Sequence, residues 1–443
     1  MEVFKLNKPD ITGKLDEVLD LFDQETDIME YVAQTNHPEY LYWNKVRFKH
    51  PPNVPPVEFW SLVKTLRKYS PNRSRTVITD EKGIYFSWQP LPGLDYFFHE
   101  VDMNLGGALE SIMIEDPSVR QRYISRGIME EAIASSQLEG ANTTRKVAKR
   151  MLVEKRKARS RSEQMILNNY QGMLHLEDHL KNHALTMDAL LNLHAILTYD
   201  TLDDAAVGHL RRDADRVVVQ NTKTNTVYYV PPSEKFMRKE IGKFIRFAND
   251  DLGKEIFVHP VIKAIMLHFW IGFLHPFVDG NGRIARAIFY WYLLRKGYWA
   301  FTYLPLSRVI KNSPAQYRDA YVYSEQDDND LTYFIDYNVR KITQARREFN
   351  DYVIKRQAEN RRMTEVARLR YDLNDRQIQL LRYLHKNPDA TSTIKTHSKV
   401  YGISRPTARK DLCTLEEFGF LESRKVGQER PFRATAKTTE LLS

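Results

Sequence analysis

The feature that most constrains this chain is a short polar loop between two strongly apolar helical segments. Residues 261–274 read VIKAIMLHFWIGFL, and residues 281–297 read NGRIARAIFYWYLLRKG, which is apolar nearly all round after its first turn. A helix that is apolar on every face must be buried on every face. The two segments therefore predict a core built from helices, with the loop HPFVDG between them.

The loop leads into the N-terminus of the second core helix. His275 precedes Pro276, which pushes it out of the α region and ends the first helix. The second helix begins near Asn281, and its first turn presents unpaired main-chain N–H groups that suit an anion. Gly280 and Gly282 let that main chain approach an anion without a side-chain clash. This end of the helix is therefore a candidate anion site.

Charged side chains in the same stretch indicate a phosphate chain with a divalent cation. Arg283 and Arg286 supply donors suited to phosphate oxygens. Asp279 would repel phosphate unless a cation lay between them, and Mg²⁺ prefers oxygen ligands. Histidine, with an ordinary pKa of about 6.5, suits proton removal from a hydroxyl, which is the role we predict for His275. Together these residues predict nucleotidyl or phosphoryl transfer.

The whole stretch HPFVDGNGRIAR resembles the signature of the Fic family, H-x-F-x-(D/E)-G-N-G-R-x-x-R, at every fixed position. The similarity extends over about residues 96–350. The resemblance implies a mainly α fold, with a Fic-type helical core and a β-hairpin flap. It also implies a protein adenylyltransferase, which moves AMP from ATP to a Ser, Thr or Tyr hydroxyl of a target protein and uses Mg²⁺.

The resemblance further implies roles for single residues. His275 would be the catalytic base, and Asp279 would hold Mg²⁺. Tyr317 falls where the family tends to place an aromatic residue near adenine, and helix packing is the alternative. The residues implied to bind the phosphates are Gly280, Asn281, Gly282, Arg283 and Arg286.

Residues 215–230 (DRVVVQNTKTNTVYYV) predict a hairpin, because β-branched and aromatic residues stand on both sides of a polar turn. This hairpin resembles the flap of the family, which aligns the target by strand addition. The docking strand would then be Val217, Val218 and Val219.

A second motif, SSQLEG, precedes the signature on a predicted helix at about 128–140. It resembles the inhibitory motif of the family, [S/T]-x-x-x-E-[G/N], with Ser135, Glu139 and Gly140 in the fixed positions. Ser135 and Glu139 share one helix face. The resemblance implies that Glu139 contacts Arg286 and so represses transfer. Removal of AMP at the same site, with Glu139 orienting a water, is the alternative reaction.

After a long charged helix at 341–370, the chain predicts three short helices and two strands, which is the winged helix-turn-helix plan. The third helix opens at Ser404, a good N-cap. DNA is one expected partner, and docking of a protein or of a second copy is the alternative. A DNA-binding regulator with a nucleotide-sensing Fic domain is the second hypothesis for function. The residues expected to meet DNA are Arg405, Thr407, Arg409 and Lys410.

These patterns divide the chain into residues 1–95, of unassigned function, a catalytic domain at 96–355, and a linker helix with the winged helix at 356–443. The net charge of +9 suits a nucleotide or nucleic acid. The single cysteine, Cys413, excludes an intramolecular disulfide and a cysteine-based metal cluster within one chain. No apolar run reaches the length of a signal peptide or a membrane span, so we expect a cytoplasmic protein without a membrane partner.

Overall fold

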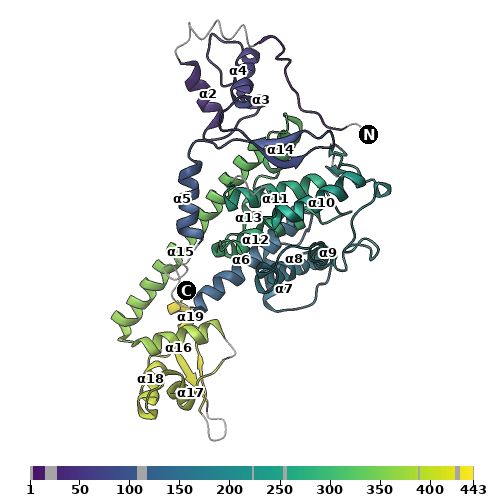
Figure 1. The fold of residues 1–443 in the computed structure, drawn as a ribbon. Helices are drawn as coiled ribbons and strands as arrows, with labels where there is room; N and C mark the ends of the chain where they lie inside the picture. The colour runs from purple at the N-terminus through teal and green to yellow at the C-terminus, as the bar shows by residue number, and fades with distance from the viewer. Residues whose placement is uncertain are drawn as a thin grey trace. The chain divides into compact units, whose positions relative to one another are not determined.

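The computed structural model describes residues 3–14, 27–106, 117–221, 224–252, 257–387, 390–424 and 430–442 (Figure 1). Contacts group the chain into two compact units, Met1–Arg347 and Glu348–Ser443. The fold is mainly helical with small antiparallel hairpins, which confirms the prediction of a mainly α fold. No helix among these residues is long and apolar enough to cross a membrane.

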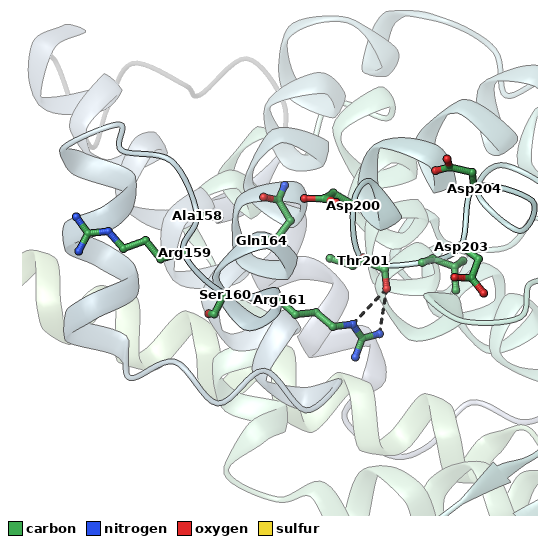
Figure 2. Close-up of a pocket in the computed structure, with 10 residues that line it drawn as sticks. Ala158, Arg159, Ser160, Arg161, Gln164, Asp200, Thr201, Asp203 and Asp204 are labelled. Carbon is green, nitrogen blue, oxygen red and sulfur yellow. Dashed lines mark hydrogen bonds between the residues drawn. The ribbon is translucent and has the colours of Figure 1, made fainter.

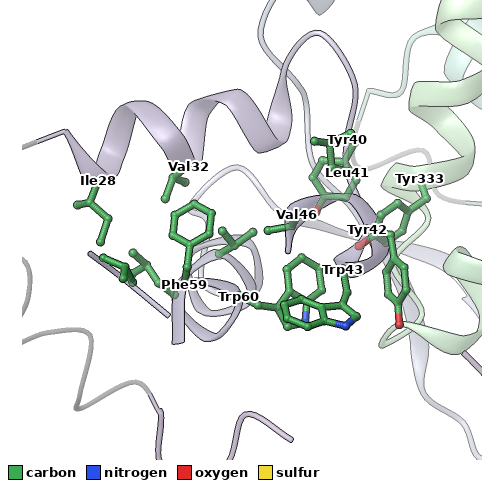
Figure 3. Close-up of a cluster of buried hydrophobic side chains, with 13 residues drawn as sticks. Ile28, Val32, Tyr40, Leu41, Tyr42, Trp43, Val46, Phe59, Trp60 and Tyr333 are labelled. Atoms are coloured by element: carbon green, nitrogen blue, oxygen red, sulfur yellow. The ribbon is translucent and has the colours of Figure 1, made fainter. Parts of the chain in front are cut away.

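The first part of the first unit forms a small aromatic core of its own (Figure 3). Phe59 and Trp60 pack there with Tyr42, and Tyr333 joins them from much later in the chain. The hydroxyl of Tyr40 also donates to Asp330 at 2.8 Å. Residues 1–95 therefore belong to the same compact unit as the helices that follow. The elements are α2 (Ile28–Asn36), α3 (Trp43–Val46), α4 (Pro56–Lys68), β1 (Ser74–Thr79), β2 (Tyr85–Trp88) and α5 (Leu94–Leu105).

The centre of this unit is a helical core around α11 (Pro260–Leu274) and α12 (Asn281–Arg295), as the two apolar segments predict. Trp270 and Trp291 are fully buried within it. Figure 1 shows α10 beside α11, and α12 also packs against α6, α8 and α9. The surrounding elements are α6 (Pro117–Leu138), α7 (Arg145–Val153), α8 (Arg161–Asp178), η2 (Leu180–Asn182), α9 (Met187–Thr198) and α10 (Glu234–Ala248).

The predicted hairpin is present but shorter than expected. Its strands are β3 (Val219–Gln220) and β4 (Val227–Tyr229), while Val217 and Val218 precede the strand. The short helix η3 (Asp213–Asp215) and the left-handed Arg216, at φ 47°, occupy the start of the predicted hairpin, so pairing begins later. Residues 222–223 of its turn lie outside the described residues.

The unit is completed by η4 (Trp299–Tyr303), α13 (Leu306–Lys311), α14 (Pro314–Gln326) and the start of α15 (Thr332–Tyr371). The long helix α15 begins nine residues before the predicted start at 341. Its first turns carry Phe334, Ile335 and Tyr337, which are buried, so the charged pattern indicated only its later part.

The second unit contains three short helices followed by a hairpin and a final helix. Leu412, Leu415 and Phe420 lie in its core with Leu381. The hydroxyl of Ser404 accepts from the N–H of Thr407, which confirms the predicted N-cap. The elements are α16 (Asp375–Lys386), α17 (Ile394–Tyr401), α18 (Arg405–Glu417), β5 (Leu421–Ser423), β6 (Phe432–Ala434) and α19 (Ala436–Leu442).

Candidate active site

The loop between α11 and α12 is closed by one of its own side chains. Asn281 is only 3% exposed, and its amide accepts from the N–H of Phe277 at 2.9 Å and donates to the carbonyl of Phe277 at 2.7 Å. Gly280 has a φ of 85°, and a Cβ there would lie 2.9 Å from Cγ2 of Thr198. The Asn281 side chain therefore braces the loop, so a phosphate contact by this residue falls to its main-chain N–H.

His275 ends α11 in a left-handed conformation, with φ 47° and ψ 56°. Its Nδ1 lies 3.1 Å from the carbonyl oxygen of Gly272. A carbonyl can only accept, so Nδ1 carries the proton and Nε2 of the neutral ring keeps its lone pair. Burial lowers the pKa of His275 below its ordinary value. The ring is thus held as a neutral base at pH 7.

Arg211 ties the start of this loop to the end of the hairpin. Its Nε donates to the carbonyl of His275 at 2.7 Å, and its Nη2 donates to the carbonyls of Leu274 at 3.3 Å and Pro232 at 2.5 Å. Its main-chain N–H also donates to Pro276 at 2.9 Å. The side chain is 4% exposed. Arg211 therefore fixes the position of the His275 main chain.

His194 supports the same loop from α9. Its ring stacks on Phe277 at 3.8 Å between centroids and 5° between planes. Nδ1 lies 3.0 Å from the N–H of Gly208, which can only donate, so Nε2 carries the proton and donates to the carbonyl of Asp279 at 3.0 Å. Burial lowers the pKa of His194 to about 4. A neutral, tautomer-specific histidine thus clamps the loop.

Two buried guanidinium groups line the α12 side of the loop. Arg283 is 1% exposed and donates from Nη1 to the carbonyl of Leu197 at 2.7 Å. Two guanidinium nitrogens, Nε of Arg283 and Nη1 of Arg286, are buried without a hydrogen-bond partner among the described residues. Leaving a charged donor unpaired in a buried site is costly, so such donors point to an anion as the missing partner. This observation fits a phosphate chain.

Asp279 presents one carboxylate oxygen for a further ligand. Oδ1 accepts from the N–H of Gly280 at 2.5 Å. Among the described residues, Oδ2 has long contacts alone, at 3.6 Å to Arg283 and 3.7 Å to Arg161, and the side chain is 40% exposed. Within the described residues, no three His, Cys, Asp or Glu side chains gather around a metal position. A single carboxylate fits Mg²⁺, which commonly takes one or two carboxylates together with substrate phosphates.

A cavity of about 710 Å³ lies between the start of α8 and the residues that follow α9 (Figure 2). Arg161 lines it and donates to the carbonyl of Thr201 from Nε at 3.2 Å and from Nη2 at 3.1 Å. Asp200, Asp203 and other residues of the α8 and α9 ends form the rest of the wall. Arg161 therefore joins this cavity to the carboxylate of Asp279.

The helix α6 carries the predicted motif to Arg286. Nη2 of Arg286 donates to Oε1 of Glu139 at 2.8 Å and to the carbonyl of Ser135 at 3.1 Å. Nε of Arg286 donates to the Ser135 hydroxyl at 2.8 Å. Burial, the largest single influence, would lower the pKa of Arg286, but Glu139 together with Tyr317 and Glu131 raises it, so the pKa lies above its ordinary value. Ser135 and Glu139 thus share the face that contacts Arg286.

Glycines and one buried acid set this contact. Gly140 has a φ of 92° and follows Glu139 directly, where α6 has ended. A Cβ on Gly282 would lie 2.1 Å from Oε1 of Glu139, so only glycine leaves room for the carboxylate. Glu131, two turns earlier, is 2% exposed and accepts from the N–H of Ser307 at 2.9 Å. α6 is therefore anchored as well as terminated beside the loop.

Tyr317 lies near this network, with its hydroxyl 2.8 Å from Nε2 of His268. Burial raises the pKa of Tyr317, and the guanidinium of Arg286 opposes that shift. His268 is fully buried, which lowers its pKa to about 3. The structure therefore places Tyr317 close to Arg286, and both readings of Tyr317, packing or nucleotide contact, stay predictions.

The hairpin lies next to the end of α11. The hydroxyl of Tyr229 donates to the carbonyl of Phe273 at 2.7 Å. Val217, Val218 and Val219 are half-buried. β3 pairs with β4 on one side, and no other described strand pairs with β3.

In the second unit, the residues predicted to meet DNA share the first turns of α18 and are exposed. They are Arg405, Thr407, Arg409 and Lys410. Arg430, which lies just before β6, forms an ion pair with Glu416 at 2.8 Å. The hairpin tip, residues 425–429, lies outside the described residues.

The sequence did not reveal Arg211, His194 or Glu131. His194 sits in an apolar helical run, where a histidine usually has a packing role. Arg211 lies in an irregular loop among other charged residues. A weak signal was available for His194 and Glu131, because a charged or polar residue in an apolar helical run must find a partner when it is buried. Which partner it finds depends on the tertiary fold.

Comparison with known proteins places the site in a family. Residues 184–293 match the Fic/DOC family. Protein adenylyltransferase fic-1 of Caenorhabditis elegans is 28% identical over 103 residues, which are 22% of this chain and 20% of that protein. Protein adenylyltransferase Fic of Drosophila melanogaster is 34% identical over 79 residues, 17% of this chain and 16% of that protein. The match thus spans a fifth or less of these relatives.

Solved structures of Fic proteins are similar to this chain at low identity. A Fic family protein from Desulfovibrio desulfuricans has 20% identity and a TM-score of 0.49, covering 77% of this chain and 95% of that one. Fic-1 from C. elegans has 14% identity and a TM-score of 0.49, covering 80% and 90%. The family match over residues 184–293 contains the whole loop from His275 to Arg286. The chain is therefore a Fic/DOC family protein, distantly related to the Fic adenylyltransferases.

Proposed function

We propose that this protein transfers AMP from ATP to a hydroxyl of a target protein, and that Glu139 represses the reaction. The observation that carries the proposal is a neutral His275 at the start of a loop that leads into α12, where the buried Arg283 and Arg286 are partly unpaired among the described residues. A base and a phosphate cradle are the two components that adenylyl transfer requires.

In this reaction His275 would act as the general base. Its Nε2 would take the proton of the target hydroxyl as the hydroxyl oxygen forms a bond to the α-phosphorus of ATP. The bond from that phosphorus to the bridging oxygen of the β-phosphate would break, and pyrophosphate would leave. The Nδ1 contact to Gly272 would hold the ring in the tautomer that can accept this proton, and Arg211 would hold the main chain of His275 in place.

Phosphate binding would be shared by the start of α12 and its arginines. The main chain of Gly280, Asn281 and Gly282, with Arg283, would hold the phosphates at the helix N-terminus. Asp279 would hold Mg²⁺, which neutralises phosphate charge when bound. Tyr317 would lie near the nucleotide base.

Repression would follow from the pairing of Arg286. Its Nη2 and Nε are committed to Glu139 and Ser135, so they are withheld from the outer phosphates. ATP would then bind in a pose unsuited to attack. The target segment would align along Val217, Val218 and Val219 by strand addition, because β3 has an edge without a described strand partner.

The first test measures label from ATP carrying a labelled α-phosphate, with Mg²⁺ and purified full-length chain. A charge-assisted hydrogen bond contributes about 1.5–3 kcal/mol, so Glu139→Gly should raise protein-bound label at least about tenfold. Glu139→Gln keeps the size of the side chain and should give an intermediate rise. Adding His275→Ala to Glu139→Gly should lower label by about a hundredfold or more.

The outcomes separate the reactions. Label that persists without His275 would rule out the proposed base. If no folded variant gains label, but the wild type releases AMP from a pre-modified target and Glu139→Gly does not, the protein is the reverse enzyme.

A second candidate function concerns the second unit, which we propose is a winged helix that binds DNA. The exposed Arg405, Arg409 and Lys410 on α18 favour it. A DNA-binding protein whose Fic domain senses nucleotide would combine both units in one chain.

A further inference from the structure

Residues 3–8, here called the leading segment, begin against the outer edge of β4. Val3 forms a parallel bridge with Val227, and the N–H of Phe4 donates to the carbonyl of Val227 at 2.8 Å. This edge is the one opposite to β3. The start of the leading segment therefore adds one bridge to the free edge of β4, in the manner of strand addition.

Gln326, the last residue of α14, holds the other side of the segment. Its Nε2 donates to the carbonyl of Phe4 at 2.9 Å, and its Oε1 accepts from the N–H of Leu6 at 2.9 Å. One side-chain amide thus makes the pair of hydrogen bonds that a neighbouring strand would make. Both hydrogen bonds go to main-chain atoms of the segment, so this clamp, formed by the Gln326 side chain, suits many sequences.

Side chains add a modest preference. The ring of Phe4 packs on Tyr228 with 5.5 Å between centroids, yet it remains 40% exposed. Lys8 donates to the carbonyl of Gln326, and its Nζ lies 3.9 Å from Asp327. The space between β4 and Gln326, here called the groove, therefore fits an extended segment with an apolar residue followed four positions later by a basic one.

The leading segment has no hydroxyl to modify. Its sequence is VFKLNK, without Ser, Thr or Tyr. The strand that it pairs with is tied to the catalytic loop region, because Tyr229 donates to Phe273, two residues before His275. The leading segment, which has no hydroxyl that could be modified, thus occupies the edge of β4 near the loop, where another strand could otherwise pair.

We propose that the groove between β4 and Gln326 is a second docking site, for an extended segment of the target protein, and that the leading segment occupies it in cis. A target must displace residues 3–8 to pair with β4, while the β3 edge stays available to the segment that carries the hydroxyl. The identity of the partner as the target rests on the proposed function, whereas the peptide groove itself does not.

The direct test uses the full chain with Phe4→Pro and Leu6→Pro, which removes both N–H donors of the segment. A fluorescent peptide of residues 2–10 should bind this vacated chain at least tenfold more tightly than the wild type, because a tethered segment competes at high effective concentration. Lys5→Pro is the matched control, since no hydrogen bond of its N–H is found in the described part of the chain, and it should behave as wild type.

The clamp is tested in the vacated chain. Gln326→Leu removes both hydrogen bonds and should weaken peptide binding about tenfold, and Gln326→Glu, which keeps an acceptor, should weaken it less. The docking site would be refuted if the peptide bound the wild-type and vacated chains equally well, or if the Gln326 substitutions left its affinity unchanged.

Labelling then tests the partner. In the Glu139→Gly background, vacating the groove should raise protein-bound label several-fold with the KM for ATP unchanged, and excess peptide should reverse the gain. Unchanged label would show that the groove does not serve the target. If Glu139→Gly alone gives no label, the proposed function fails, and the peptide titration still decides the groove.

Discussion

His194 shows how a single residue can be structural and pH-sensitive at once. Both ring nitrogens are used, one accepting from Gly208 and one donating to Asp279. Protonation would give the ring a second N–H, at Nδ1, where it would face the N–H of Gly208, which is also a donor. The loop that carries Asp279 therefore depends on the neutral form of a residue that the sequence presents only as part of an apolar helix.

This dependence predicts a loss of stability in acid. The pKa of His194 is lowered by burial to about 4 in the folded chain, against about 6.5 when unfolded. Its contribution is complete above about pH 6.5 and is lost as the pH falls toward 4, because only the unfolded chain binds the proton in that window. His194→Gln should flatten the pH dependence by about 2 kcal/mol between pH 7.5 and 5. Denaturant unfolding of both chains across this range measures the difference. Parallel pH profiles would contradict the assignment.

At the scale of the element, α6 matters through its end as much as its face. The helix places Ser135 and Glu139 on Arg286, and the glycine that follows lets the chain turn away at once. Helical periodicity predicted the shared face. The anchoring of the same helix through Glu131 to the start of α13 depends on a contact across 176 positions of sequence, which no local pattern contains.

Gly140→Ala should therefore loosen the contact between Glu139 and Arg286, which we propose to be inhibitory. An L-residue at φ 92° costs about 1 kcal/mol or more, so the chain should shift away from this turn. We expect lower thermal stability and protein-bound label between that of wild type and Glu139→Gly. Gly242→Ala is the control, because Gly242 lies inside α10 with no atom within 4 Å of its missing Cβ. That change should stabilise by about 0.5–1 kcal/mol and leave label unchanged. Equal label from wild type and Gly140→Ala would show that the turn at Gly140 does not contribute to repression.

At the scale of the whole molecule, the chain combines a Fic domain with a second compact unit. The net charge of +9 is a property of both units together and does not identify a nucleic-acid surface. The exposed basic residues at the start of α18 make a specific surface that can be tested separately.

Duplex DNA should bind the full-length chain through α18. Arg405→Ala with Arg409→Ala should weaken binding and reduce the slope of log affinity against log salt by about 2, because each lost phosphate contact removes about one released counterion. Lys235→Ala with Lys239→Ala, on the exposed face of α10, removes the same charge and should change little. Fluorescence anisotropy at several salt concentrations measures both. Equal effects of the two pairs would assign any binding to net charge alone.

Local patterns predicted much of the fold. Apolar runs predicted α11 and α12, and capping predicted the start of α18 at Ser404. The start of α15 was missed because its buried turns do not share the charged pattern of its later part. The hairpin was predicted too long, since nothing local showed that Arg216 turns left-handed before pairing begins.

By itself, the sequence determined the apolar helices, the polar loop between them and the shared face of Ser135 and Glu139, because these depend on residue types at short, regular spacings. The tertiary structure alone decided which buried groups meet: His194 with Asp279, Arg211 with His275, and the leading segment with Gln326. Hydrogen bonds between distant residues exist only once packing brings donor and acceptor within about 3 Å. The spacing of residues along the chain contains no information on that distance.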